Sequence, residues 1–145
     1  MYAAEDAAEI EREVVELHRV IEGWLAGRLS RSSQAFAAFA DLLAEDFSVL
    51  PPDGTVVSRE NVLYGFEGAH GALPGVAVEI RAFRFIDSGA EIGVARFEEW
   101  QQHVSNSNAR ASLVAMRRDP IARHGWRWLA LHEAWLPGGA PDGED

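Results

Sequence analysis

Arg96, Glu98 and Glu133 have the residue types and the spacing that acid–base chemistry needs. Glu133 alternates with Leu131 and Trp135, and this two-residue period predicts a strand on which the carboxylate shares a face with large apolar side chains. Arg96 and Glu98 also share one strand face, and we expect the three charged groups to converge in an internal pocket. Because burial raises the pKa of a carboxylate and a nearby arginine lowers it, two carboxylates beside one arginine can differ in protonation. We therefore predict Glu98 and Glu133 as catalytic residues and Arg96 as a ligand-binding residue, with a partly wet ion pair of no catalytic function as the alternative.

Two aromatic residues are further candidates for ligand binding. Trp100 lies two positions after Glu98 on the same predicted face and is placed to close the pocket, whereas Tyr64 lies on a predicted helix at the pocket mouth. Simple core packing is the alternative for both side chains. The histidines in loops have no metal-ligand spacing to another histidine or to an acid, so no metal site is predicted. His18 flanks the apolar side of the first predicted helix and is expected to be a histidine at the edge of the core rather than a ligand.

The opposite face of the last predicted strand carries Trp126, Trp128 and His132, by the same two-residue parity. Exposed aromatic side chains on a sheet usually mark a contact surface. We therefore expect these three residues in the interface of a homodimer. A pocket position for His132 is the less favoured alternative.

Composition excludes several classes of function. The chain of 145 residues contains no cysteine, which rules out disulfides and thiolate chemistry, and its 13 basic residues are all arginines, so no lysine can form a Schiff base. The formal net charge of -10 argues against a surface that binds nucleic acid. No apolar run approaches the roughly 18 residues that span a bilayer, and no signal peptide is visible. We expect a cytoplasmic bacterial protein that needs no membrane and no cofactor.

The order of the predicted elements indicates an α+β fold. Helices are expected around 10–24, 33–43 and 58–69, a hairpin around 47–57, and long strands at 76–86, 91–102, 110–117 and 125–135. The first helix is predicted from an apolar stripe at steps of four and three, formed by Ile10, Val14, Leu17, Ile21 and Trp24. The apolar alternation of the first long strand slips near Ala82, which predicts a β-bulge that bends the strand. Helices packed on one face of a bent antiparallel sheet enclose a cavity. One domain is expected over 1–137, followed by a flexible tail at 138–145.

Several short motifs resemble the nuclear transport factor 2-like superfamily, and its SnoaL-like branch most of all. They are Asp46-Phe47 entering a strand, the turn Pro52-Asp53-Gly54, and the Trp-x-x-x-His strand from Trp128 to His132. The last half of the chain also resembles the association domain of calcium/calmodulin-dependent kinase II. Membership implies a cone-shaped, curved antiparallel sheet with three N-terminal helices over its concave face, a deep pocket and frequent dimers through the sheet.

The resemblance also implies roles for particular residues. Arg96 stands where the association domain has a pocket arginine, whereas Glu133 stands where that domain has a second arginine, so Arg96 and Glu133 could pair inside the cone. The spacing Arg96-x-Glu98 is similar to the acid–arginine–acid site of limonene epoxide hydrolases, another branch of the superfamily. In that site one carboxylate activates water and the other acts as an acid.

Three functions remain open because this fold hosts enzymes, scaffolds and binders. The first is binding of an unidentified small molecule in an apolar pocket that carries Arg96, Glu98 and Glu133. The second is a cofactor-independent hydrolase, isomerase or lyase that uses Glu98 or Glu133 as its base. The third is a scaffold that assembles through the sheet face. No motif in the chain identifies a ligand.

Overall fold

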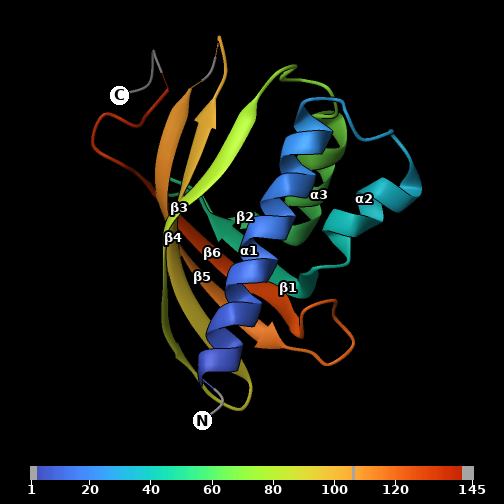
Figure 1. The fold of residues 1–145 in the computed structure, drawn as a ribbon. Helices are drawn as coiled ribbons and strands as arrows, with labels where there is room; N and C mark the ends of the chain where they lie inside the picture. Colours follow the sequence, from blue (N-terminus) through green and yellow to red (C-terminus); the bar gives the residue numbers. More distant parts are fainter. Residues whose placement is uncertain (1–2, 106, 142–145) are drawn as a thin grey trace.

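A computed structural model describes residues 3–105 and 107–141 and shows helices packed against one face of a curved, six-stranded sheet (Figure 1). The elements in chain order are α1 (Ala3–Leu25), α2 (Ser33–Ala40), β1 (Leu43–Leu50), β2 (Val57–Ser58), α3 (Arg59–Gly68), β3 (Ala77–Ser88), β4 (Ile92–Gln102), β5 (Asn108–Arg118) and β6 (Trp126–Trp135). The spatial order of the strands is β2-β1-β6-β5-β4-β3. The predicted α+β class, with three helices over a curved sheet, is therefore confirmed.

One strand pair departs from the predicted antiparallel sheet. β1 runs parallel to β6, whereas every other neighbouring pair of strands is antiparallel. Parallel neighbours require a long crossover connection, and here α3 and the strands β2 to β5 separate the two along the chain. Alternation within a strand shows which residues share a face but not in which direction the strand runs. Periodicity could therefore not reveal that one pair of strands is parallel.

Helix α1 crosses the concave face of the sheet (Figure 1). Its predicted apolar stripe is confirmed, because Ile10, Val14, Leu17 and Trp24 are all buried. Side chains at steps of three and four lie on one side of a helix, so the stripe can face the sheet along the length of α1. None of the helices in the described part of the chain has an apolar stretch long enough to cross a membrane.

The β-bulge predicted in β3 is present. Ala82 has a φ of 54°, and the pairing with β4 shifts register between Arg81 and Arg84. A bulge inserts one residue into the ladder and increases the local bend of the strand. The bulge therefore contributes to the curvature that wraps the sheet around α1.

A second bulge, in β6, was not predicted. The register pairs are Ala115 with Ala130 and Met116 with Trp128, so Leu129 is an extra residue in the ladder. An inserted residue shifts the side-chain alternation by one position. The residues before Leu129 and those after it therefore cannot be assigned to faces by one continuous parity.

This bulge overturns part of the predicted dimer interface. Trp126 and Trp128 lie on the concave face and are fully buried under α1, where their indole N–H groups donate to Glu9 and Glu13. His132 is exposed on the convex face, as predicted. Two of the three proposed interface residues are thus core residues that anchor the sheet to α1.

The predicted face of β4 is also wrong. Gly93, Ala95 and Phe97 face α1 and are buried, whereas Arg96 is exposed on the convex face. A Cβ atom on Gly93 would lie 2.7 Å from the Ile10 Cδ1 atom and 3.1 Å from the buried ring of Trp126, so a larger residue would force these side chains to shift. The small residues were needed for helix–sheet contact, and the charged residues with which they alternate therefore face outward.

The C-terminal segment is held further along than predicted. The Ala109 N–H donates to the Gly139 carbonyl at 2.8 Å, and the Leu136 N–H donates to the Ala109 carbonyl at 3.0 Å. Gly139 is buried, so this part of the predicted tail packs beside the start of β5. Residues 142–145 of the predicted tail lie outside the described residues.

The close contact at Gly93 is open to a direct test. Gly93→Ala should lower the free energy of unfolding by about 1–3 kcal/mol, because the new methyl group overpacks the contact with Ile10. Urea unfolding measures this loss. Gly89→Ala is the matched control, because a Cβ atom there meets nothing within 4 Å. Equal losses in the two variants would mean that α1 does not pack on β4 as described.

Candidate functional site

A partly open cavity of about 150 Å³, called here the inner cavity, lies between the helices and the concave face of the sheet. Most of its wall is apolar and consists of Leu17, Ile21, Phe39, Leu43, Phe47, Val49, Val62, Trp128 and Leu131. Three ionisable side chains, His18, Glu99 and Glu133, interrupt this wall. A mostly apolar enclosure with a few polar groups is the usual composition of a small-molecule site.

Glu133 lies on the inward face of β6, where the sequence predicted it. Its side chain is only 6% exposed, and it stands opposite Ser112 in the pairing of β5 with β6. Arg110 donates through one amino group to both carboxylate oxygens, at 3.3 and 3.4 Å. Charge-assisted hydrogen bonds of this kind are usually about 2.7–2.9 Å long. Glu133 is therefore held loosely and keeps capacity for another partner.

A buried ion pair between His18 and Glu99 forms the second polar part of the cavity wall. The Nε2 atom of His18 lies 3.2 Å from a Glu99 carboxylate oxygen, and its Nδ1 atom lies 2.7 Å from the Val14 carbonyl oxygen. Both partners accept hydrogen bonds, so both ring nitrogens must donate and the ring is an imidazolium. The His18 side chain is 4% exposed and that of Glu99 is 8% exposed, so this pair joins α1 to β4 away from water.

The two partners shift each other's protonation. Burial alone would lower the pKa of His18, but the charge and hydrogen bond of Glu99 raise this pKa above its usual 6.5. Burial alone would raise the pKa of Glu99, but His18, helped by Arg110 and Gln101, lowers it to about 2. Glu99 is therefore a fixed negative charge at neutral pH.

Glu133 shows the opposite behaviour. Burial raises the pKa of Glu133 above its usual 4.5, and the negative charge of Glu99 adds to this effect, although Arg110 opposes it. The cavity thus holds one carboxylate that stays ionised and one that takes up a proton more readily. Two neighbouring carboxylates with opposite pKa shifts are the arrangement that acid–base catalysis uses.

A chain of hydrogen bonds links the two carboxylates around the edge of the cavity. The Gln101 amide donates to Glu99 at 2.6 Å, and the Asn108 amide donates to the Gln101 carbonyl oxygen at 3.4 Å. Arg110 donates to the Asn108 carbonyl oxygen at 2.9 Å and, on its other side, to Glu133. The guanidinium of Arg110 also lies over the Trp135 ring, 4.9 Å from its centroid. Arg110 is therefore held on three sides beside Glu133.

The structure does not bring the predicted trio together. Arg96 and Glu98 lie on the convex face of β4, and only Glu133 lies in the cavity. Glu98 accepts a hydrogen bond at 3.0 Å from the indole N–H of Trp100, which also lies on the convex face. The guanidinium of Arg81 stacks on that indole at 4.2 Å. Arg110 and Glu99, rather than Arg96 and Glu98, are the arginine and the second carboxylate that lie near Glu133.

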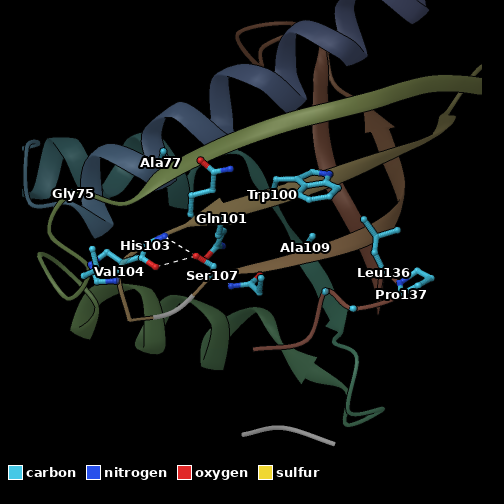
Figure 2. A pocket seen from close by; sticks show the side chains of 14 residues that line it. Gly75, Ala77, Trp100, Gln101, His103, Val104, Ser107, Ala109, Leu136 and Pro137 are labelled. Carbon is cyan, nitrogen blue, oxygen red and sulfur yellow. Dashed lines mark hydrogen bonds between the residues drawn. The ribbon is translucent and has the colours of Figure 1, made fainter. Parts of the chain in front are cut away.

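Trp100 lines a second, open groove of about 680 Å³ at the end of the sheet (Figure 2). Gln101 and Asn108 line it too, so the hydrogen-bonded chain from the inner cavity reaches this groove. Figure 2 shows Trp100, Ala109 and Leu136 near one another, on the opposite side of the view from His103 and Val104. Tyr64, the other predicted aromatic ligand contact, is 83% exposed on α3 and does not line the inner cavity.

Two signals in the sequence could have found the correct residues. The small side chains of Gly93 and Ala95 mark the face of β4 that a helix approaches, and Glu99 shares their parity. His18 follows Val14 by one helical turn and therefore lies on the inward side of α1. Among the described residues no cluster of histidine and acidic side chains has the geometry to hold a metal ion.

The His18–Glu99 pair predicts a defined pH dependence. Because the pKa of His18 is raised in the folded state, its contribution to stability is fully present below about pH 6.5 and is lost as the pH rises through the folded pKa. The contribution of Glu99 is lost instead as the pH falls from 4.5 towards 2. NMR titration of the His18 ring in the native protein should give a midpoint above 6.5.

The variant Glu99→Gln should move the His18 midpoint below that of the native protein, because it removes the charge that raises the pKa. The same variant should abolish the loss of stability above neutral pH, measured by urea unfolding at several pH values. Glu98→Gln, at the adjacent position on the opposite face of β4, is the control and should leave the midpoint unchanged. A midpoint that responds equally to both variants would contradict the pairing.

The sequence matches no protein-family model, and no curated protein matches it either. Solved structures do match. An NTF-2 like protein of unknown function from Pseudomonas aeruginosa has a TM-score of 0.81 and 28% sequence identity, over 89% of this chain and 99% of that chain. An NTF2-like protein of unknown function in nutrient uptake from Rhodospirillum rubrum has a TM-score of 0.64 and 15% identity, over 86% of this chain and 98% of that one.

The association domain of C. elegans CaMKII matches with a TM-score of 0.70 and 11% identity, over 91% of this chain and 97% of that chain. The likenesses at 11% and 15% identity concern the fold alone. They agree with the family resemblance that the short sequence motifs indicated. The protein is therefore nuclear transport factor 2-like in fold, as its sequence predicted.

Proposed function

We propose that this protein binds a small, largely apolar molecule in the inner cavity, with Glu133 as its polar contact. The observation that carries the proposal is the state of Glu133, a buried carboxylate with loose hydrogen bonds in an otherwise apolar wall. Burying a charge costs stability unless the charge is well paired, so such groups concentrate at functional sites.

The size of the cavity limits the ligand. An apolar cavity of about 150 Å³ engineered into another protein holds one benzene ring. The inner cavity has about this volume, and Phe39, Phe47 and Trp128 supply aromatic surface to its wall. A ligand with one six-membered ring, or an aliphatic group of similar volume, fits this space.

A cofactor-independent hydrolase, isomerase or lyase is the second candidate. It is supported by the opposite pKa shifts of Glu99 and Glu133 beside a shared arginine, Arg110. In this alternative Glu133 exchanges a proton with the substrate, while Glu99 keeps His18 charged and in place. The catalytic role predicted for Glu133 is retained, whereas Glu98 has no role here and the inward-facing Glu99 acts only through His18.

We also propose that the protein self-associates through the convex face of the sheet. A scaffold that assembles through this face is the third candidate function. The described helices lie on the other side of the sheet (Figure 1), and Leu113 is 42% exposed at the middle of β5. His132 is its partner in register, and the alanines at 111, 115, 130 and 134 leave the surrounding surface flat. The cytoplasmic location expected from the sequence stays a prediction.

Filling the cavity should abolish ligand binding. Val62→Phe adds a ring inside a cavity that holds about one ring, so the affinity for fluorobenzene should fall at least tenfold relative to the native protein. Fluorine NMR of the probe measures binding. Val56→Phe is the matched control, because Val56 is 65% exposed and does not line the cavity. Binding that survives Val62→Phe, or no binding to the native protein, would contradict the proposal.

A charge on the convex face should break the proposed dimer. Leu113→Arg places a cation at the centre of the exposed apolar surface, so the mass measured by light scattering should fall from that of a dimer to that of a monomer. Ile121→Arg, in the exposed loop before β6, is the control and should remain dimeric. A native protein that is monomeric at all concentrations would refute the interface.

A further inference from the structure

The three polar residues of the cavity wall, His18, Glu99 and Glu133, differ in how fully their hydrogen-bonding atoms are paired. Both ring nitrogens of His18 have partners, and both oxygens of Glu99 accept, one from His18 and one from Gln101. This half of the wall therefore has its strongest contacts within the protein. A ligand gains little by competing for atoms that are already bonded.

Glu133 and the two residues beside it, Arg110 and Ser112, are less completely hydrogen bonded. Among the described residues, the buried Ser112 Oγ and Arg110 Nε atoms have no hydrogen-bond partner. Ser112 is 4% exposed and stands directly opposite Glu133 in the ladder, which itself has only long contacts to Arg110. Buried polar groups in native proteins are nearly always satisfied, so neighbouring unsatisfied groups mark a place for an additional partner.

The charges of the cluster select against an ionic ligand. When Glu133 is ionised, the two cations His18 and Arg110 balance the two carboxylates Glu99 and Glu133. A charged ligand would leave a net charge in a largely apolar cavity, where an unbalanced ion is disfavoured. An anionic ligand would also meet two carboxylates in the cavity wall.

We propose that Glu133 and Ser112 together recognise the hydroxyl group of a neutral, ring-sized ligand. A hydroxyl group both donates and accepts, so it can donate to the Glu133 carboxylate and accept from the Ser112 hydroxyl at the same time. Ser112 does not itself line the cavity but stands opposite Glu133 in the ladder, so the proposal requires a change of its χ1 angle that turns the hydroxyl towards the ligand beside Glu133. The inference rests on the proposed binding function and names the ligand class, an alcohol or phenol with one ring.

Calorimetry of the full chain with four probes of one size tests the selectivity. Phenol should bind at least tenfold more tightly than toluene, because a hydrogen bond to a charged group contributes about 1.5–3 kcal/mol and about 1.4 kcal/mol is a factor of ten. Benzoate and benzylammonium carry a charge and should bind more weakly than phenol.

Two variants test the residues. Ser112→Ala and Glu133→Gln should each reduce the preference for phenol over toluene at least threefold while toluene affinity stays the same. Ser30→Ala, in an exposed loop, and Glu91→Gln, at an exposed position between β3 and β4, are the matched controls and should keep the native preference. Unfolding curves identify any variant that fails to fold, and toluene binding confirms that the cavity of each variant is intact.

The outcomes separate the two levels of the proposal. Equal affinity for phenol and toluene, tighter binding of either ion, or an unchanged preference in Ser112→Ala would overturn the hydroxyl site while leaving a ring-binding cavity. Failure of every probe to bind the native protein would overturn the binding function as well. Loss of the preference in both variants, with toluene still bound, is the result that the hydroxyl site requires.

Discussion

The placement of α1 on the concave face is the constraint on which the rest of this structure depends. Apolar packing alone would let a helix slide along a sheet. Three ionisable side chains of α1, however, each form an ion pair with a residue of the sheet or of a loop that joins its strands. Arg118 holds Asp6, Arg123 holds Glu13, and Glu99 holds His18. Such ion pairs add little net stability, but leaving the buried Asp6, Glu13 or His18 without its partner is costly, so the pairs act mainly to define one position of the helix.

That position determines the cavity. The helix packs closely on the sheet at Gly93. The cavity lies further along the helix, beside His18, and Glu99 and Glu133 are in its wall. The ion pair that fixes the helix is therefore also part of the cavity wall. Stability and site chemistry use the same residues here, which explains why Glu99 is held strongly ionised while Glu133, one strand beyond Arg110, is not.

The sheet separates two kinds of surface. Its concave side combines a few well-bonded charges with aromatic and aliphatic walls, which suits enclosure of a small neutral molecule. Its convex side carries alanines around Leu113, with the Trp100 indole between Arg81 and Glu98 near one edge. Binding in the cavity and contact with another protein chain can therefore take place on opposite faces without competing for residues.

The sequence by itself determined the α+β class, the apolar stripe of α1, the bend at Ala82 and the inward direction of Glu133, because each follows from a periodicity within one element. It also carried the motifs that identified the fold. These patterns are local, and a helix or strand displays them wherever it is placed. The charged residues could not identify which face of β4 is inward, since both faces of that strand carry a glutamate, and the small side chains of Gly93 and Ala95 were the one local signal of that face.

Only the tertiary structure decided which residues form the site. The extra residue at Leu129 reversed the parity of β6, and the approach of α1 to Gly93 turned Glu99 inward and Arg96 outward. His18 and Arg110 became site residues because α1 and β5 were brought to the same carboxylates from distant parts of the chain. A single inserted residue or one close helix contact exchanges the two faces of a strand, and neither leaves a periodic signal in the sequence.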